Sequence, residues 1–382
     1  MDRAVNFENH YDAARVRGDW EEARHWLQQG ARAGDPFSCG QLGVWHLLGH
    51  VVNRNDRTGF QLVRGAARAG LPEARRLIAT LYALGRGVKP NWEQAVDWLV
   101  RGARSGDPDP ARQLAFLLPA ALAGERRALL ESAAKSGDVI AQRRLQRDGK
   151  VNAAPRMDWR RIRQGAARPA LVRGAIKAVS ESPKLHQREA ALSPDVCDYL
   201  ICIAAPFLSR ARVNDPVRGT ELVDDSRTNS FATLSLVESD VVTTGIDFML
   251  ARLLGQTPKN AEPASVLHYS PGEQFAPHFD FFDPKAPVHA AQIAAAGQRV
   301  MTCLVYLNND YEGGATRFLD TGFEFRGEAG TALFWRNTDA NGLPDRSTLH
   351  AGLPPTAGEK WLLSKWFRDR PYTQVRTATM VG

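Results

Sequence analysis

The sequence predicts a multidomain protein in which an N-terminal all-α repeat array is followed by an antiparallel, double-sheet β domain. Two observations support this prediction. Residues 1–150 are self-similar, with glycines recurring at a step of 36 residues in Gly34, Gly70 and Gly106. Residues 260–370 instead contain short strand-like segments separated by Gly and Asn/Asp turns. A period in the mid-thirties indicates an α-solenoid with two helices per unit, whereas many short strands with such turns indicate a double-sheet β fold.

The residues before each repeated glycine share a size pattern. A fourth glycine, Gly137, follows Gly106 after 31 residues. The residues three and four positions before the glycines are small, and those seven and eight positions before are large: Ala31, Ala67, Ala103 and Ala134; Gly30, Ala66, Gly102 and Ala133; Leu27, Val63, Leu99 and Leu130; Trp26, Leu62, Trp98 and Leu129. Small residues let neighbouring helices pack closely, and glycine favours the left-handed position after a helix. Each segment is therefore predicted to be a helix that ends at its glycine.

The other half of each unit also repeats, since residues 42–49 match residues 78–85 at the same offset of 36. The array resembles Sel1-like repeats, relatives of the tetratricopeptide repeat, in about three to four copies over residues 15–148. The last copy is short, and its Leu-Leu-Pro break at 117–119 is typical of a terminal cap. The resemblance implies a surface that binds proteins or peptides. The alternative is an array that only stabilises the neighbouring domain.

Size and composition bound the class of protein. A chain of 382 residues predicts two or three domains, and 43% hydrophobic with 24% charged residues is ordinary for a soluble globular protein. No apolar run approaches the roughly 18 residues of a membrane helix, and the first 20 residues lack the apolar segment of a secretory signal. The four cysteines show no paired framework, which favours a reducing compartment. We therefore expect a cytoplasmic protein without membrane contact.

Positive charge is concentrated at one junction. Residues 143–177 hold eleven Arg or Lys and two Asp, a net +9 against +7 for the whole chain. Such a segment can attract nucleic acid or an acidic protein, and the alternative is a solvated linker helix running to Lys177. We place the domain boundaries at 1–150 for the repeats, 151–180 for the basic linker and 181–382 for the second domain.

The second domain is predicted to begin with helices and continue as strands. Ser193 and Pro194 form an N-cap and first turn for a helix over 196–208, and a second helix is expected over about 238–254. Expected strands are 265–269, 274–280, 299–307, 315–318, 323–325, 331–335, 348–352 and 360–367, with a loop over 281–298 whose Ala-rich part, 290–296, is a short helix. Short strands with this punctuation predict a jelly roll whose mouth can hold a metal.

Four residues within the strand-rich region have the composition of a metal centre. His278 and Asp280 are two residues apart, and on an extended strand they would point the same way. His350 can complete a face of two imidazoles and one carboxylate, which suits non-haem Fe(II) and leaves positions open for a co-substrate and O2. Lys360, ten residues after His350, supplies a cation that can anchor an acidic co-substrate.

Longer segments around these residues resemble the prolyl 4-hydroxylase alpha-subunit family. The matching segments are 191–200, 227–230, 266–280, 298–308, 312–316, 333–335, 347–352 and 358–366, so the resemblance covers roughly 190–369. It implies a double-stranded β-helix, or jelly-roll, dioxygenase that uses Fe(II), 2-oxoglutarate and O2, with ascorbate as a reductant.

The resemblance also implies roles for individual residues. His278, Asp280 and His350 would be the iron ligands, and Lys360 would pair with the far carboxylate of 2-oxoglutarate. Two hydroxyls, from Tyr269 and Thr302, would reach the same carboxylate, and Trp366 would line the pocket. For Tyr269 and Thr302 the alternative is an ordinary strand residue. We interpret His268 and His289 as bystanders, and assign Arg227 and Arg299 either to substrate contact or to structural ion pairs.

The leading functional hypothesis is hydroxylation of a protein or peptide side chain, most simply proline, with the repeats recruiting the substrate. Hydroxylation of another residue, a free amino acid or a small metabolite stays open, because Asn229 stands where a serine is common in the family. A different class of function is a repeat-based adaptor with the oxygenase domain as scaffold, but a scaffold has no need of the complete set of metal and co-substrate residues. RNA binding through the basic junction is a third reading.

Overall fold

The structure, a computed structural model, describes residues 5–149, 156–167, 175–211, 213–214, 221–222, 225–339 and 341–372. The chain divides into two compact units, Met1–Pro169 with Ser239–Gly245, and Ala170–Glu238 with Ile246–Gly382. The sequence did not indicate that the short segment 239–245 groups with the repeats. None of the helices in the described part of the chain combines the length and the apolar character that a bilayer crossing requires.

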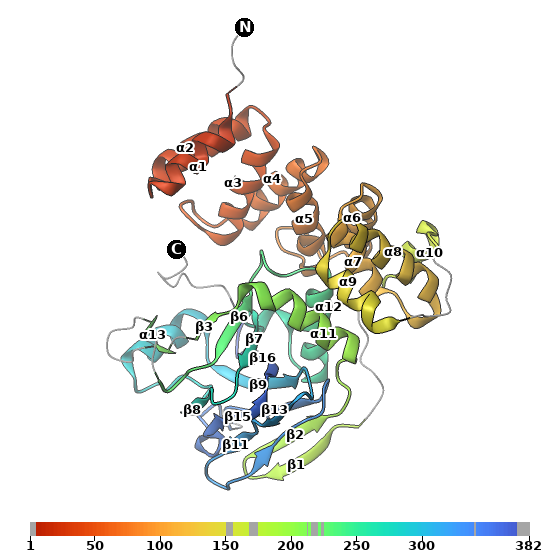
Figure 1. Ribbon diagram of the computed structural model, residues 1–382. Helices are drawn as coiled ribbons and strands as arrows, with labels where there is room; N and C mark the ends of the chain where they lie inside the picture. Colours follow the sequence, from red (N-terminus) through yellow and green to blue (C-terminus); the bar gives the residue numbers. More distant parts are fainter. Residues whose placement is uncertain are drawn as a thin grey trace. The chain divides into compact units, whose positions relative to one another are not determined.

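The first unit is an array of helices that pack against their neighbours in chain order (Figure 1). Its helices are α1 Phe7–Val16, α2 Trp20–Arg32, α3 Pro36–Leu48, α4 Asp56–Arg68, α5 Pro72–Leu84, α6 Trp92–Arg104, α7 Pro108–Leu117, α8 Ala123–Lys135, α9 Val139–Asp148 and α10 Trp159–Gly165. This arrangement confirms the predicted all-α repeat architecture, with α1 adding a helix that begins before the predicted residue 15.

The helix ends follow the predicted glycine rule. Gly34, Gly70, Gly106 and Gly137 all adopt positive φ, at 78°, 106°, 88° and 90°, one residue beyond the C-cap of α2, α4, α6 and α8. Only glycine occupies this left-handed conformation without steric cost. The break at 117–119 also has its predicted effect, since α7 stops after 10 residues where α3 and α5 run for 13.

Small residues allow the closest approach between helices of this unit. The large residues of the pattern, such as Leu27, Val63 and Leu99, are fully buried. At Gly59 there is no room for a side chain, because an added Cβ atom would lie 2.8 Å from the backbone oxygen of Gly43 and 2.7 Å from Leu47 Cγ. Helices α3 and α4 therefore touch backbone to backbone at this crossing.

This contact predicts a site-specific effect on stability. Gly59→Ala should destabilise the protein by about 1–3 kcal/mol, because the added methyl group overlaps backbone that cannot move aside. Gly65→Ala is the matched control in the same helix, because a Cβ there meets nothing within 4 Å and should add up to about 1 kcal/mol through helix propensity. Denaturant unfolding followed by circular dichroism measures both, and equal effects would contradict the packing described for α3 and α4.

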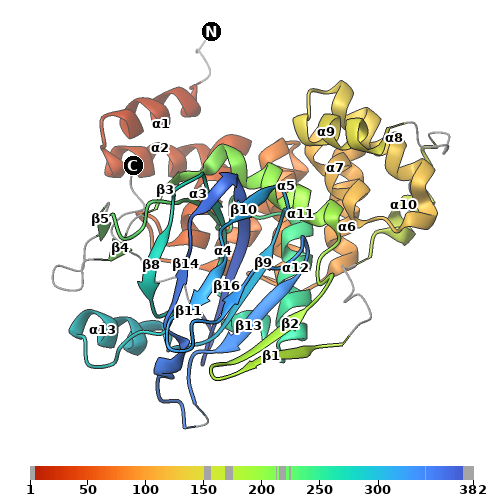
Figure 2. The same ribbon diagram turned by 60° about the horizontal axis from the view of Figure 1, so that its bottom comes forward.

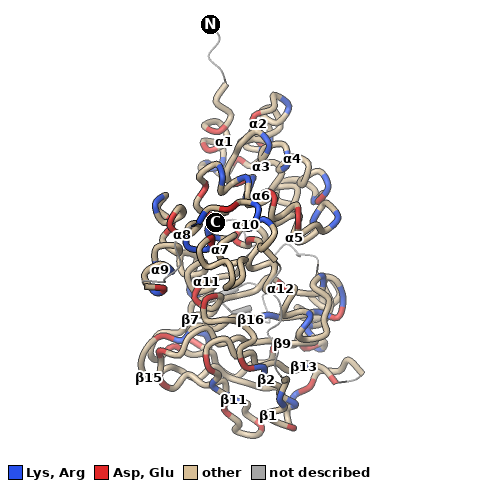
Figure 3. Tube along the Cα trace, turned by 90° about the vertical axis from the view of Figure 1, so that its right-hand side faces the viewer, with Lys and Arg blue, Asp and Glu red and all other residues tan. Residues whose placement is uncertain are grey.

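The basic junction is shorter as a helix than predicted and is partly neutralised. Helix α10 ends at Gly165, and Lys177, the predicted end of the helix, begins a strand; residues 168–174 lie outside the described ranges. Arg163 pairs with Asp97 of α6, and Arg161 pairs with Glu125 of α8 at 2.8 Å. Figure 3 shows acidic and basic segments interspersed along this unit. The ion pairs give the basic side chains a structural role within the helical unit.

In its described residues, the second unit contains an eight-stranded and a four-stranded sheet, two separate two-stranded pairs and flanking helices (Figures 1 and 2). Its helices are α11 Pro194–Ala204, α13 Pro287–Ala296 and the part of α12 Val241–Leu253 that follows Gly245. Its strands are β1 Lys177–Glu181, β2 Lys184–Arg188, β3 Ser209–Arg210, β4 Val213–Asn214, β5 Glu221–Leu222, β6 Ser230–Leu234, β7 Ala264–Tyr269, β8 Phe275–His278, β9 Arg299–Tyr306, β10 Tyr311–Gly313, β11 Thr316–Phe318, β12 Glu324–Phe325, β13 Ala332–Arg336, β14 His350–Gly352, β15 Pro355–Gly358 and β16 Lys360–Arg368.

The strands form the predicted double-sheet architecture. The larger sheet has the order β1-β2-β13-β9-β16-β7-β6-β3, and the smaller has the order β12-β11-β14-β8. All described pairings within the two sheets are antiparallel. The core includes Leu267, Leu304 and Leu362 of the larger sheet and Phe318 of the smaller. This arrangement confirms the jelly roll, and helix α11 packs on β6 and β7.

Some predicted boundaries were wrong where side-chain chemistry overrides strand pattern. The strand predicted over 274–280 ends at His278, so Asp280 lies in a bend beyond it. The strand predicted from Thr348 begins at His350, because Asp345 caps a single 3-10 turn over Arg346–Thr348. The hairpin β1–β2 was not predicted, because the basic composition of its surroundings indicated a linker. The domain boundaries at 150 and 180 stay predictions.

Candidate metal and co-substrate site

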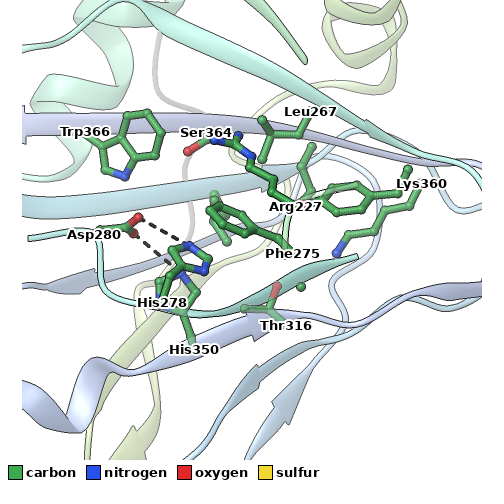
Figure 4. A pocket seen from close by; sticks show the side chains of 14 residues that line it. Arg227, Leu267, Phe275, His278, Asp280, Thr316, His350, Lys360, Ser364 and Trp366 are labelled. Carbon is green, nitrogen blue, oxygen red and sulfur yellow. Dashed lines mark ion pairs between the residues drawn. The ribbon is translucent and has the colours of Figure 1, made fainter. Parts of the chain in front are cut away.

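The three candidate ligands meet between the two sheets. His278 and His350 are directly opposite each other in the β8–β14 pairing, so strand register alone brings the imidazoles together. Asp280 reaches them from the bend after β8, with Oδ1 3.8 Å from His278 Nε2 and Oδ2 3.7 Å from His350 Nε2. One ligand atom of each residue lies within 4.8 Å of the others, and Figure 4 shows the three side chains converging.

Hydrogen bonds orient both imidazoles for a metal. His278 Nδ1 lies 2.9 Å from the carbonyl oxygen of Ala276, and His350 Nδ1 lies 2.9 Å from that of Thr348. A carbonyl oxygen only accepts, so each Nδ1 carries the proton and each Nε2 presents a lone pair toward Asp280. Histidine ligands in metal sites are oriented in the same way, by a hydrogen bond from the ring nitrogen that does not bind the metal.

Electrostatics favour the protonation states that ligation needs. Desolvation in the cavity wall, and then the charge of His350, lowers the pKa of His278 to about 3, so its imidazole is neutral at physiological pH. Burial alone would raise the pKa of Asp280. The two imidazoles, Arg299 and the Thr302 hydroxyl outweigh that effect and hold the pKa below its usual value. The site therefore offers two imidazole Nε2 atoms and one carboxylate, the donor set of non-haem Fe(II) centres.

Lys360 is buried in the same cavity without a hydrogen-bond partner. Its side chain is fully buried, its Nζ has no partner among the described residues, and it lies 4.9 Å from the ring centroid of Tyr269. Tyr269 is its cross-strand neighbour in the β16–β7 pairing. Burial lowers the pKa of Lys360 to about 7. An ammonium buried without a counter-ion is costly, so this group is suited to pair with an anion that enters the cavity.

A single cavity joins the metal ligands to Lys360. It is lined by Arg227, Leu267, Tyr269, Phe275, His278, Asp280, Leu304, Thr316, His350, Gly352, Lys360, Leu362, Ser364 and Trp366. Figure 4 shows Lys360 at one end and the triad at the other, with Arg227 and Phe275 between them. The walls are mostly apolar with a few polar groups, the composition of a small-molecule site.

Of the remaining predicted residues, two line the cavity and one does not. Tyr269 and Trp366 line the cavity, as Lys360 does. Thr302 lies elsewhere: it is fully buried, its Oγ1 donates to Asp280 Oδ2 at 2.7 Å, and it is not among the lining residues. The hydroxyl near Lys360 belongs instead to Thr316 of β11 (Figure 4).

The other histidines and the two arginines of this region have contacts of different kinds. The ring of His268 lies near Trp361 and Glu359, on the strand face opposite to Tyr269, and His289 accepts a hydrogen bond from Asp283 N. Arg299 forms a two-point ion pair with Glu262 and lies 3.9 Å from the ring centroid of Trp366, so the structural alternative holds for it. Arg227 lines the cavity, 4.3 Å from the ring centroid of Phe275.

Sequence reasoning missed Ser364, Thr316 and Phe275. Ser364 was within reach of simple alternation, because Lys360, Leu362, Ser364 and Trp366 occupy every second position of β16 and share one face. Phe275 lies 3.5 Å from the His278 ring, centroid to centroid. No local signal marks Thr316, because its place opposite Lys360 follows from the stacking of the two sheets.

Comparison with known proteins agrees with this geometry. Residues 264–368 match the 2OG-Fe(II) oxygenase superfamily, and residues 11–35, 36–71 and 72–107 match the Sel1 repeat. The chain is 32% identical over 259 residues to prolyl 4-hydroxylase subunit alpha-1 of Gallus gallus, covering 65% of this chain and 50% of that protein. It is 31% identical over 223 residues to prolyl 4-hydroxylase 2 of Arabidopsis thaliana, covering 53% of this chain and 73% of that protein.

Among solved structures, the viral collagen prolyl hydroxylase of Paramecium Bursaria Chlorella virus-1 in complex with 2OG is 26% identical. It aligns with 50% of this chain and 98% of its own, at a TM-score of 0.38. The chain spans half the length of the Gallus gallus subunit that it matches.

Proposed function

This chain belongs to the prolyl 4-hydroxylase family of Fe(II)- and 2-oxoglutarate-dependent oxygenases, and from that premise we propose that it hydroxylates a prolyl residue of a protein or peptide. One oxygen atom of O2 would enter the product and the other would enter succinate, with release of CO2. The observation that supports this proposal is the pairing, within one cavity, of a two-histidine, one-carboxylate face with an unpartnered buried lysine.

Each end of the cavity fits one part of the reaction. His278, Asp280 and His350 would hold Fe(II), which supplies the redox chemistry that couples decarboxylation of the 2-oxo acid to hydroxylation of a C–H bond. The Nε2 lone pairs and the ionised carboxylate are ready as ligands without proton loss. Three protein ligands on one face leave the opposite face for co-substrates.

Lys360 fits the far carboxylate of 2-oxoglutarate. Its buried ammonium would form a charge-assisted hydrogen bond, which is stronger than a neutral one in an apolar wall. Tyr269 and Thr316 place hydroxyl groups in the same part of the cavity, so we assign the hydroxyl role foreseen for Thr302 to Thr316. Trp366, Leu267 and Leu362 line the same cavity and exclude water from it.

The depressed pKa of Lys360 predicts a pH dependence for co-substrate binding. Below pH about 7 the free protein already carries the ammonium, so the Kd for 2-oxoglutarate should not change with pH. Above that value Lys360 is neutral in the free protein and must take up a proton on binding. The Kd should therefore rise about tenfold per pH unit. Anaerobic titration of the Fe(II)-loaded protein between about pH 6 and pH 9 measures this, and a flat profile would contradict the assignment.

We further propose that the Sel1 repeats recruit the substrate protein, since repeats of this class present extended binding surfaces. Hydroxylation of another residue, or of a free amino acid or small metabolite, is the alternative within the same chemistry. The adaptor reading is disfavoured by Lys360, whose unpaired burial serves no packing purpose. Nucleic-acid binding at the junction is disfavoured by the ion pairs of Arg161 and Arg163. Cytoplasmic location and use of ascorbate as reductant stay predictions.

One experiment separates these alternatives. The full chain is incubated with Fe(II), 2-oxoglutarate and a pool containing proline-rich peptides, matched peptides with proline replaced by alanine, and free amino acids. Mass spectrometry then locates the gain of one oxygen atom. Oxygen on proline in peptides alone supports the proposal, whereas oxygen on free amino acids or on the alanine-matched peptides overturns it in favour of the corresponding alternative.

A further inference from the structure

The two oxygens of Asp280 have different surroundings. Oδ2 accepts a hydrogen bond from Thr302 Oγ1 at 2.7 Å, whereas Oδ1 has no such donor among the described residues and lies 3.8 Å from His278 Nε2. Asp280 is 5% exposed and Thr302 fully buried, so no bulk water competes for this contact. The carboxylate is therefore asymmetric before any metal binds.

A second hydrogen bond fixes the direction of the first. Asn337, which is fully buried, donates from Nδ2 to Thr302 Oγ1 at 2.9 Å. The hydroxyl has one proton, so accepting from Asn337 leaves that proton for Asp280. With the amide reversed, one hydroxyl proton would face two acceptors, and one of them would be unsatisfied in the interior. The order Asn337 to Thr302 to Asp280 is thus the one that satisfies the Thr302 hydroxyl and gives Asp280 Oδ2 a donor, while Asn337 Oδ1 has no partner among the described residues.

The chain topology explains why Asp280 needs this support. His278 and His350 are fixed by the β8–β14 pairing, but Asp280 lies in a bend past the end of β8. Thr302 sits in the middle of the larger sheet, paired with Trp335 on one side and Trp366 on the other. Asn337 follows β13, and its backbone N–H donates to the carbonyl oxygen of Val300. The two hydrogen bonds therefore connect Asp280, the one candidate ligand that lies outside a strand, to the rigid larger sheet.

We propose that Thr302 and Asn337 are positioning residues that hold the Asp280 carboxylate in the orientation in which it faces the two imidazoles. This inference rests on the metal site of the proposed function and adds to it the residues that orient its carboxylate. With Oδ2 held by the hydroxyl, the carboxylate would be kept from rotating away from the position that metal binding requires. Thr302 acts through Asp280 and does not touch the co-substrate.

The test uses direct metal binding by the full chain. Thr302→Val keeps the shape of the side chain and removes the hydroxyl. It should weaken binding of Fe(II), and of Co(II) as a spectroscopic substitute, by about 10–100-fold, the usual effect of losing an outer-shell partner. Thr302→Ser should restore wild-type affinity. Asn337→Leu leaves the hydroxyl in place without its donor, so a smaller loss of about fivefold is expected.

Spectroscopy separates positioning from a general loss of packing. The Co(II) absorption spectrum of Thr302→Val should differ from that of the wild type, because the Asp280 carboxylate is then free to change its orientation. Thr80→Val is the control for a lost buried hydroxyl, since Thr80 is fully buried in α5 and bonds only its own helix among the described contacts; it should change neither affinity nor spectrum.

The possible outcomes distinguish failure of the positioning role from failure of the proposed function. If wild type binds Fe(II) and Thr302→Val binds it equally well with an unchanged Co(II) spectrum, the positioning role is overturned while the metal site stands. If Thr302→Ser fails to restore affinity, the hydroxyl is not the operative group and the inference is again wrong. If the wild type itself binds neither metal, the proposed function fails first.

Discussion

Replacing His350 with alanine should abolish Fe(II) binding and lower 2-oxoglutarate turnover by at least about 1,000-fold, a barrier increase of about 4 kcal/mol. His350 supplies one of only three converging ligands in the described part of the chain, and two ligands do not hold Fe(II) against water. Metal titration and succinate formation measure the two effects on the same protein.

His186→Ala provides the matched control for this result. His186 is also a strand histidine that contacts an aromatic ring, but it lies in β2 of the larger sheet and stacks on Phe334. It is not among the residues lining the cavity. Metal affinity and turnover should stay at the wild-type level. Equal losses in both variants would mean that removal of a ring from this core, and not loss of a ligand, causes the effect.

Lys360→Met should raise the KM and Kd for 2-oxoglutarate by about 100-fold or more, because the far carboxylate loses its charged partner in a desolvated site. The same change should leave the stability of the free protein intact or increase it, since it removes a buried amino group that has no hydrogen-bond partner in the described structure. A lysine that only stabilised the fold would show the opposite pattern.

Lys365 on the same strand offers a matched comparison. It is also buried, but its Nζ pairs with Asp247 Oδ1 at 2.7 Å. Lys365→Met should therefore lower stability, because it leaves the Asp247 carboxylate without its partner, while 2-oxoglutarate binding stays unchanged. If both variants lose stability and neither loses co-substrate affinity, Lys360 is not the anchor.

Much of this arrangement follows from local sequence pattern. The glycine-terminated helices were predictable because a left-handed turn after a helix strongly favours glycine, and the phase of Gly34, Gly70 and Gly106 fixes the repeat. The ligands His278 and His350 were predictable because their types and spacing match a known family. Trp366 was identified as a pocket residue by the same resemblance, and it shares one face of β16 with Lys360.

The remaining features depend on contacts between distant segments. Asp280 was expected on a strand beside His278, yet it lies in a bend and is held by Thr302, 22 positions away in sequence. Thr302 was expected to contact the co-substrate. The family resemblance identifies the residue, but it does not give the direction of its hydroxyl group. Asn337, 35 positions further on, carries no motif of its own. Such partners become visible only when both sheets are assembled.

The most direct test of the central claim is succinate formation by the full chain with Fe(II), 2-oxoglutarate, O2 and a proline-rich peptide, run beside His278→Ala. The account predicts succinate and hydroxyproline in equal amounts from the wild type, and neither product from the variant. Wild-type protein that yields no more succinate than His278→Ala, although it binds Fe(II), would contradict the claim that this cavity is an oxygenase site.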